Sequence, residues 1–386
     1  MTEQFGTFDF GLDEAQEERA ARLHRECVIV DVLFQGPVGY RVFDDEMNKE
    51  LQARLKETHD TLGTFSYGLE APIRRAFAGR MDEVKDHWDA SGITCGNRQV
   101  EMSDVRHIRE RSFAFVQKQF DYFPWLTKAL TAGDIRRAHE TGTHAGLMSS
   151  QVMLGPWRDL DALAWAHDSG LRMCQLTYNN MTAVGVGSTE RTDAGLSAFG
   201  VDSVKAMNEL GIIVDTGHVG RMTTLDACEV SEAPVVASHT AAQGVFNHAR
   251  GKSDEELRAL AATGGLIGIV TVPFFLGAGP SVTINAMLDH VEYVADVAGV
   301  DHVAIGTDWP MQLPQWMLSD LLQPIFAETG FRPEDKLVAT QQLAGFDDYR
   351  DFPNITRGLV GRGWSDEDIA KVLGENFVRV MGAVCG

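Results

Sequence analysis

Two histidines stand where short apolar runs end. His218 follows the strand-like run in GIIVDTGHVG, and His239 follows the run PVVAS. Each run has the length and the β-branched composition of a buried strand. Imidazoles at the ends of neighbouring parallel strands can meet on one divalent metal ion, or can exchange protons with a substrate. The spacing therefore predicts a metal-binding or acid–base site at His218 and His239.

An aspartate and an arginine are further candidates for this site. Asp308 ends the run DHVAIGTD, and a carboxylate at the end of a buried strand needs a metal, a histidine or backbone donors, because unpaired burial is costly. Arg250 lies in NHARGKS, ahead of an expected helix, and its planar fork of donors suits a substrate carboxylate. We predict a site role for Asp308. For Arg250 a carboxylate clamp and a surface or capping role both remain open.

The elements that would position these residues alternate along the chain. Expected strands cover residues 28–33, 92–95, 145–150, 171–177, 212–215, 235–238, 266–270 and 303–306. Expected helices cover residues 13–26, 81–91, 103–132, 159–169, 201–210, 223–230, 253–263 and 284–298. Strand followed by helix at short intervals specifies parallel strands joined by right-handed crossovers. We therefore predict a single α/β domain over residues 1–386, a (β/α)8 TIM-type barrel, with a doubly wound open sheet as the second choice.

One region departs from this alternation. Residues from about 40 to 130 hold polar, helix-prone stretches, and we expect a helical insertion there that caps the barrel mouth. The aromatic residues of 103–132 are expected in the core or at an interface. No glycine-rich phosphate loop follows an expected strand, so the sequence gives no support to a nucleotide-binding fold.

Composition and charge exclude several classes of partner. The chain has 386 residues, 44% of them hydrophobic, and a formal net charge of −21. A nucleic acid is not an expected partner, because two polyanions repel each other. No apolar run reaches the roughly 18 to 20 residues that a membrane span needs. The five cysteines form no CxxC pair, which is typical of reduced thiols. We expect a cytoplasmic protein that binds neither nucleic acid nor membrane.

Longer stretches resemble a known hydrolase family. The run from DTGHVGRMTTLDACEV through PVVASHT to RGKSDEELRALAATGGLIGI is similar to the membrane (renal) dipeptidase family. LTYNN, DHVAIGTDW and GENFVRVMG also match that family, and the likeness is specific from about residue 146 to 306 and at the C-terminus. The resemblance implies a (β/α)8 barrel of the amidohydrolase group in which a pair of zinc ions serves to cleave a dipeptide amide.

The resemblance also assigns roles to single residues. His218 and His239 match the two histidine ligands of one zinc ion. Arg250 matches the arginine that holds the substrate carboxylate. Asp308 matches the aspartate that handles the proton of the attacking water and of the leaving amine.

Other positions depart from the family pattern. Leu33 and Gln35 stand where the family has a histidine and an aspartate ligand, and Gln151 stands where it has a bridging glutamate. Tyr178 stands in place of a substrate-contacting histidine. Amides and alkyl groups are poor ligands for a dication. We therefore expect at most one divalent metal, zinc first, with a metal-free site as the alternative. Tyr178, Gln151 and Asn179 are expected to contact the substrate.

These observations favour one function and leave two others open. The first is a dipeptidase-like amidohydrolase that cleaves the amide of a small carboxylate-bearing substrate with at most one divalent metal. The second is a non-hydrolytic enzyme on the same barrel, namely a lyase, isomerase or decarboxylase, that uses one metal or none. The third is a non-catalytic homologue that binds a ligand. The resemblance and the aromatic-rich region also predict a homodimer.

Overall fold

The chain closes a barrel of parallel strands. The computed structural model describes residues 4–34, 42–153 and 159–386. Each barrel strand pairs in parallel with its neighbours, and the pairing of the first strand with the last closes the ring. In ring order the strands are β1 (Val30–Asp31), β2 (Cys95–Gln99), β4 (His144–Ser150), β5 (Leu171–Gln175), β6 (Ile213–Asp215), β7 (Val235–Ala242), β9 (Leu266–Ile269) and β10 (Val303–Ile305). The prediction of a (β/α)8 barrel is confirmed, and the open-sheet alternative is wrong.

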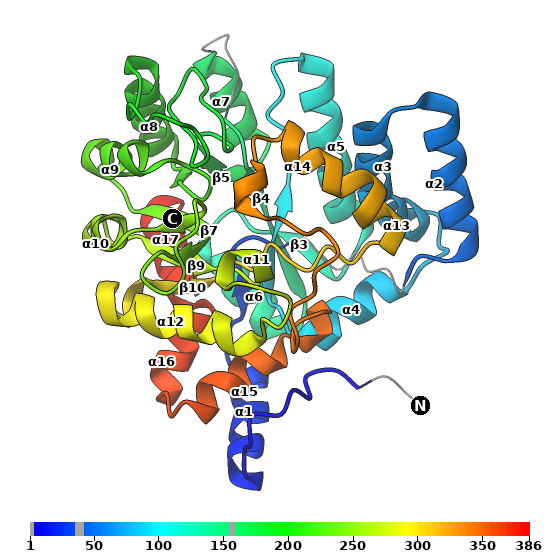
Figure 1. Cartoon of the computed structure of the whole chain (residues 1–386), viewed down its shortest axis with the longest axis vertical. Helices are drawn as coiled ribbons and strands as arrows, with labels where there is room; N and C mark the ends of the chain where they lie inside the picture. The colour runs from blue at the N-terminus through cyan, green and yellow to red at the C-terminus, as the bar shows by residue number, and fades with distance from the viewer. Residues whose placement is uncertain (1–3, 35–41, 154–158) are drawn as a thin grey trace.

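Helices cover the outer face of the barrel. Every residue of β4, β6, β7, β9 and β10 is buried, because side chains fill the barrel on one face and helices pack on the other. Figure 1 shows these helices around the strands. From residue 160 to 298 they are α7 (Leu160–Asp168), α8 (Ala198–Leu210), α9 (Arg221–Val230), α10 (Asp254–Ala262) and α12 (Ile284–Ala298). Each lies where the sequence predicts a helix.

The range 40–130 holds both added helices and barrel elements. Helix α1 (Glu14–Glu26) precedes β1 and lies outside this range. The helices between β1 and β2 are α2 (Asp45–Thr58), α3 (Thr61–Phe77) and α4 (Glu83–Ser91). Helices α2 and α3 pack against each other at one side of the molecule. Because β2 is itself a strand of the barrel, the range expected as one helical insertion contains part of the barrel ring as well.

The helix expected over 103–132 ends early. Helix α5 (Arg106–Tyr122) stops before Pro124, and Phe123 is extended with φ −93° and ψ 105°, as a residue before proline prefers. The next elements are β3 (Leu126–Lys128), which pairs with β4, and α6 (Ala132–Thr141). Phe123 stacks on Phe77 of α3 with ring centroids 5.4 Å apart, so part of this aromatic cluster packs within the chain.

The C-terminal part of the chain covers the barrel. Helix α14 (Gln323–Glu328) lies in front of the strands in the view of Figure 1, and α13 (Gln315–Met317) lies toward α3. Helix α15 (Pro353–Gly361) packs on α1. Smaller elements are β8 (Gly251–Lys252), α11 (Pro273–Leu276), α16 (Asp366–Ala370), α17 (Asn376–Val384), the 3-10 turns η2 (Val300–His302), η4 (Pro333–Asp335) and η5 (Tyr349–Asp351), and the π-helical turns η3 (Leu318–Leu322) and η6 (Lys371–Glu375).

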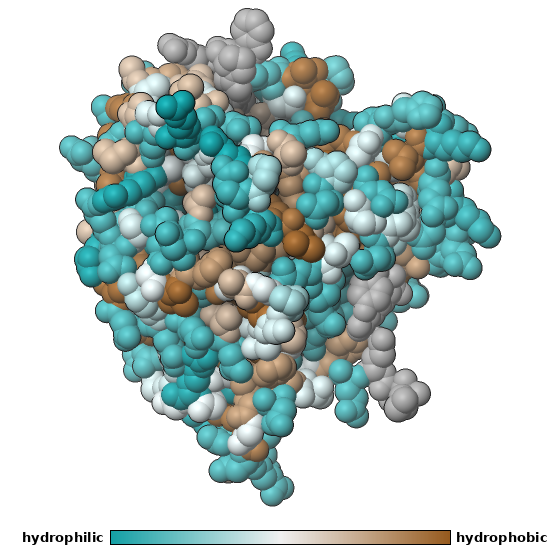
Figure 2. Space-filling view, in the orientation of Figure 1, coloured by the Kyte–Doolittle hydropathy of each residue, from teal (hydrophilic) through white to brown (hydrophobic). Residues whose placement is uncertain are grey.

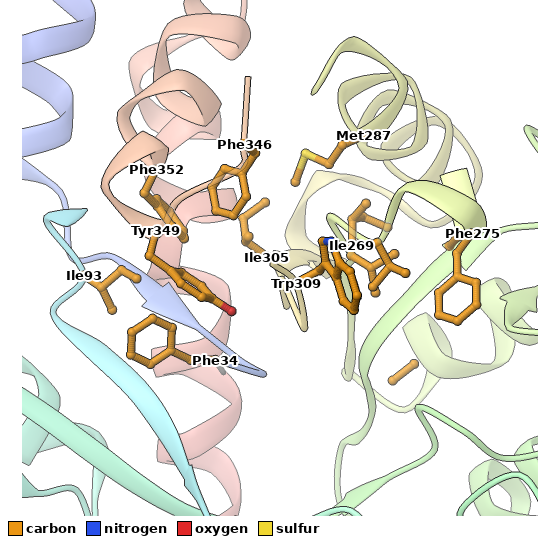
Figure 3. Packing of buried hydrophobic residues seen from close by; sticks show 14 of the residues in the cluster. Phe34, Ile93, Ile269, Phe275, Met287, Ile305, Trp309, Phe346, Tyr349 and Phe352 are labelled. Carbon is orange, nitrogen blue, oxygen red and sulfur yellow. The ribbon is translucent and has the colours of Figure 1, made fainter. Parts of the chain in front are cut away.

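Aromatic packing joins this part to the first strand. The Phe34 ring meets the Tyr349 ring edge-on, with centroids 4.7 Å apart, and Figure 3 shows both beside Ile93 and Phe352. The Tyr349 hydroxyl lies 3.2 Å from Oγ1 of Thr307, which follows β10. All five cysteines are free thiols. In the ranges that the structure covers, no helix is long and apolar enough to cross a membrane.

Candidate functional site

The barrel brings three predicted site residues together at the carboxyl ends of its strands. His218 follows β6, His239 lies in β7, and Asp308 follows β10. One ligand atom of each residue lies within 4.8 Å of the others. His218 and His239 are buried, whereas Asp308 is partly exposed. Two imidazoles and a carboxylate at this separation can share a divalent cation or pass protons to a substrate.

Hydrogen bonds determine which nitrogen of His218 faces the site. His218 Nδ1 lies 2.8 Å from Oδ1 of Asn179, whose Nδ2 donates to the Thr329 carbonyl oxygen at 2.9 Å. Because a carbonyl oxygen only accepts, the Asn179 amide turns its NH2 to Thr329 and its oxygen to His218. His218 therefore carries its proton on Nδ1. Its Nε2 is buried and has no hydrogen-bond partner, so a lone pair is left there.

A second set of hydrogen bonds orients His239. Ser238 Oγ donates to Oδ2 of Asp215 at 2.5 Å and lies 2.7 Å from Nδ1 of His239. The single hydroxyl proton is used toward Asp215, so Ser238 accepts from Nδ1–H of His239. Burial raises the pKa of Asp215, and the hydrogen bonds from Ser238 and from the Gly217 backbone act against this rise. These hydrogen bonds from Asp215 through Ser238 to His239, here called the relay, leave the lone pair of His239 on Nε2, on the opposite side of the ring.

The same arrangement recurs where β1 lies beside β10. Asp31 accepts from the backbone N–H of Thr307 at 2.9 Å and from Oγ1 of Thr307 at 2.5 Å. Thr307 directly precedes Asp308, as Ser238 precedes His239. Burial raises the pKa of Asp31 to about 8. Asp308 itself has φ +55°, a left-handed conformation that persists in a non-glycine residue only where its surroundings impose it.

Both histidines of the site are neutral at neutral pH. Burial is the main cause that lowers the pKa of His218 and of His239 well below the usual value, and the charges of Arg250 and Lys252 lower both further. Lys252 is buried beside Glu256, at 3.2 Å. A neutral imidazole is the form that binds a metal or accepts a proton. Burial, aided by the charges of Arg250 and Lys252, therefore keeps both rings in the form that either role needs.

Arg250 is a buried anchor with donors to spare. One terminal nitrogen donates to the Gly217 carbonyl, and the other donates to the His239 carbonyl at 3.1 Å. The guanidinium carbon lies 5.4 Å from the Phe275 ring centroid. Burial lowers the pKa of Arg250 to about 10, with Asp308 acting against this, so the side chain stays charged. Of its five N–H donors, Nε is buried without a partner. The surface alternative for Arg250 is wrong, because the side chain is buried.

Three other predicted contact residues adjoin the histidines. The Tyr178 ring stacks on His218 with centroids 3.8 Å apart, and burial together with Asp308 raises its pKa, so the phenol stays neutral. Gln151 Nε2 lies 3.4 Å from His239 Nε2. With Asn179 already placed against His218, the structure brings all seven predicted site residues together. Their roles stay predictions.

The positions that depart from the family pattern offer few ligands. Leu33 is buried, and its alkyl side chain cannot bind a cation. Gln35 lies outside the described residues. Among the residues that the structure does describe, His218, His239 and Asp308 form the one group of three metal-ligating side chains close enough to share an ion. The residues present therefore fit one cation at this place.

Several residues that support the site were not predicted from sequence. Ser238 and Thr307 could have been found, because each directly precedes a candidate residue at a strand end. Gln175 ends β5, and its Oε1 accepts from the backbone N–H of His218 at 3.2 Å. The Phe331 ring lies 6.4 Å from the His218 ring. No sequence pattern near Phe331 or Thr329 indicates their place at the site, because both are far from His218 in the chain.

A closed (β/α)8 barrel with two neutral histidines and an aspartate at its strand ends is typical of metal-dependent amidohydrolases. The sequence profile of the membrane dipeptidase family (peptidase family M19) matches residues 17–322 and 337–385. The chain belongs to this family, as the sequence resemblance predicted. Membership implies a metal-dependent hydrolase that uses a divalent metal, usually zinc.

Individual relatives agree with this assignment. Dipeptidase tcpJ of Claviceps purpurea (strain 20.1) is 27% identical over 346 residues, which are 87% of this chain and 72% of that protein. Dipeptidase verJ of Clonostachys rogersoniana is 28% identical over 322 residues, 81% of this chain and 75% of that protein. The crystal structure of an amidohydrolase from Pseudomonas aeruginosa superimposes with a TM-score of 0.71 and 26% identity. The matched region covers 95% of this chain and 98% of that one.

Proposed function

We propose that this protein is a dipeptidase-like hydrolase that cleaves the amide bond of a small, carboxylate-bearing substrate with one divalent metal, zinc first. The observation that carries the proposal is the buried Nε2 of His218, which has no hydrogen-bond partner. A buried nitrogen without a partner is costly, and a bound cation would remove that cost. The dipeptidase names of the relatives from Claviceps purpurea and Clonostachys rogersoniana support amide cleavage.

The donor set suits zinc. Two neutral imidazoles and one carboxylate are ligands that zinc accepts, and the fourth position of such a site holds water or substrate. The outer hydrogen bonds of His218 and His239 leave Nε2 as the unprotonated nitrogen in both rings, as is usual for metal-bound histidines. A cation at His239 Nε2 would replace the contact with Gln151 there. A bound ion would supply a Lewis acid and a water of lowered pKa.

The remaining residues supply binding and proton transfer. Asp308 takes a proton from the attacking water at its carboxylate and returns it to the nitrogen of the departing amine. Arg250 holds the substrate carboxylate with the N–H groups that the Gly217 and His239 carbonyls leave unused. Tyr178, as a neutral phenol, donates a hydrogen bond to the amide oxygen as negative charge develops there.

The proposal of one metal rests on charge. Two dications held close together need several carboxylates around them. Leu33 offers no donor atom, and Gln151 offers an uncharged amide. Arg250, buried near the same point, adds positive charge that a second cation would have to oppose. One ion beside Asp308 is therefore the arrangement that these residues favour.

The test is metal content per chain, measured by elemental mass spectrometry, together with turnover of a dipeptide panel in ¹⁸O-labelled water. We expect about one ion per chain in the wild type, as a single closed donor set predicts, and its loss in His218→Ala and His239→Ala. His107→Ala, an exposed histidine on α5, is the matched control and should keep the ion. Turnover should place one ¹⁸O atom in the acid product.

Three results would count against the proposal. Two ions per chain would contradict the single-metal site. Full activity after removal of all metal, without ¹⁸O in the product, would favour the lyase, isomerase or decarboxylase alternative. Unchanged metal content in both histidine variants would place the metal elsewhere.

A further inference from the structure

A segment outside the family match reaches the site. Residues 323–336, here called the strap, lie between the two ranges that match the family profile. The strap contains α14 and η4 and crosses the front of the barrel in Figure 1. The same face is largely hydrophilic, with apolar side chains gathered near its centre (Figure 2).

The strap contacts three separate loops of the barrel mouth. Its Thr329 carbonyl accepts from Nδ2 of Asn179, in the loop after β5. The ring of its Phe331 lies 6.4 Å from His218, which follows β6. The carbonyl of its Asp335 lies 3.1 Å from Nε2 of His248, in the loop after β7. The strap is therefore tied to the loops that carry the site.

Gly330, next to Thr329, allows the strap to lie close to the loop after β5. Gly330 has φ +92°, and a Cβ atom built on it would lie 2.5 Å from Oδ1 of Asn180. A side chain at this position would clash with that of Asn180, next to Asn179, so either the strap or the exposed Asn180 side chain must move. Asn179 has a left-handed backbone itself, with φ +52°, which asparagine tolerates better than most residues.

We propose that the strap is a positioning element that selects the tautomer of His218, acting through Asn179. An asparagine amide can present either its oxygen or its NH2 to a neighbour. The Thr329 carbonyl can only accept, so it draws the NH2 group and leaves the oxygen for His218. Without that carbonyl the amide could turn, donate to Nδ1 and leave the proton of His218 on Nε2.

The wrong tautomer would remove the free nitrogen from the site. A protonated Nε2 has no lone pair for a metal ion or for a substrate proton. Here the inference rests on the proposed function, which gives Nε2 of His218 its use. The tautomer itself, however, is a property of the metal-free protein and can be measured without any assumption about the reaction.

Gly330→Ala tests the proposal, with Gly363→Ala as the matched control. Gly363 also has a positive φ, +80°, but a Cβ atom there would meet nothing within 4 Å. The two variants therefore share the strain of a left-handed alanine, and only Gly330→Ala adds a clash between the strap and the loop after β5. The tautomer of His218 is read from ¹⁵N chemical shifts of the imidazole in histidine-labelled, metal-free protein, and zinc affinity from competition with a chromogenic chelator.

We expect the wild type and Gly363→Ala to show the Nδ1–H tautomer of His218, and Gly330→Ala to show a mixture. Zinc affinity should fall roughly 10- to 100-fold in Gly330→Ala, the usual effect of losing an outer-shell partner. Asn179→Asp added to Gly330→Ala should restore the Nδ1–H tautomer, because both carboxylate oxygens accept whichever way they turn. A general loosening of the fold would not be repaired by that second change.

The proposal is overturned if Gly330→Ala keeps the pure Nδ1–H tautomer, or if Asn179→Asp fails to restore it. Should the tautomer respond as expected while wild-type protein binds no zinc, the inference stands and the proposed metal function fails. If the wild type binds zinc but the tautomer of His218 does not change in Gly330→Ala, the proposed metal function stands and the inference about the strap fails.

Discussion

The Ser238→Ala variant probes the relay that orients His239. The substitution removes one oxygen atom from a buried strand end and leaves the backbone N–H of residue 238 bonded to Asp215. It deletes the hydrogen bond from Ser238 Oγ to Asp215, at 2.5 Å, and the contact of that oxygen with Nδ1 of His239, at 2.7 Å. His239 then has no acceptor for its Nδ1 proton.

The size of the effect follows from these two contacts. A buried hydrogen bond contributes about 1 kcal/mol between neutral groups and about 1.5–3 kcal/mol to a charged group, so losing both contacts should lower the free energy of unfolding by about 2–4 kcal/mol. Loss of the partner that orients a metal-bound histidine lowers metal affinity roughly 10- to 100-fold. Both changes come from one atom, because Ser238 Oγ serves Asp215 and His239 together.

Zinc affinity by chelator competition and unfolding in urea measure the two effects. Ser203→Ala is the matched control: it makes the same change at a buried serine whose hydroxyl bonds only the Phe199 carbonyl within α8, at 2.7 Å. We expect zinc affinity to stay unchanged in that variant. If Ser238→Ala bound zinc as tightly as Ser203→Ala does, the relay would have no part in orienting His239.

Three further predictions address stability and turnover. Burial lowers the pKa of His24 to about 4. Between about pH 6.5 and pH 4 the unfolded chain therefore binds a proton at His24 that the folded chain does not bind. The free energy of unfolding decreases as the pH falls through this range. Between pH 7 and 5 the wild type should lose about 2 kcal/mol more than His24→Gln in urea unfolding, and equal losses would refute the assignment. Arg250→Lys should raise KM for dipeptides about 10- to 100-fold, the worth of a charged hydrogen bond, and reduce the preference over carboxyl-amidated analogues; an unchanged preference would remove the carboxylate role. Tyr178→Phe keeps the ring stacked on His218 but should lower kcat about 100-fold at similar KM, so a change in KM alone would argue for simple binding.

The barrel could be predicted from sequence because its strands are local patterns. Each is a short apolar run, and parallel strands covered on both faces need such runs. His218, His239 and Asp308 could be placed for the same reason, since strand ends in a barrel converge on one mouth. The prediction of one long helix over 103–132 was wrong at Pro124. The proline ring disfavours helical backbone in the residue before it, so the helix ends although the sequence around it is helix-prone.

The supporting hydrogen bonds could not be predicted in the same way. The bond from Asn179 to Thr329 joins residues 150 positions apart, and it ends on a backbone carbonyl that any residue type would provide. Gln175 resembles any polar residue at the end of a strand, and only the structure shows its contact with the His218 backbone. Sequence patterns report periodic burial, whereas the orientation of a side chain depends on which distant loops meet it.

The two aspartate clamps explain why these strand ends hold their geometry. Asp215 and Asp31 each end one strand and accept both the backbone N–H and the hydroxyl of the residue before a site side chain, Ser238 before His239 and Thr307 before Asp308. An aspartate side chain that receives two bonds from one residue fixes the direction of the chain as well as its distance. The next side chain then leaves the backbone at a set angle, which is what a metal ligand or a proton acceptor requires. Both clamps are present although Leu33 and Gln151 offer no charged ligand, and this supports the single-ion site proposed above.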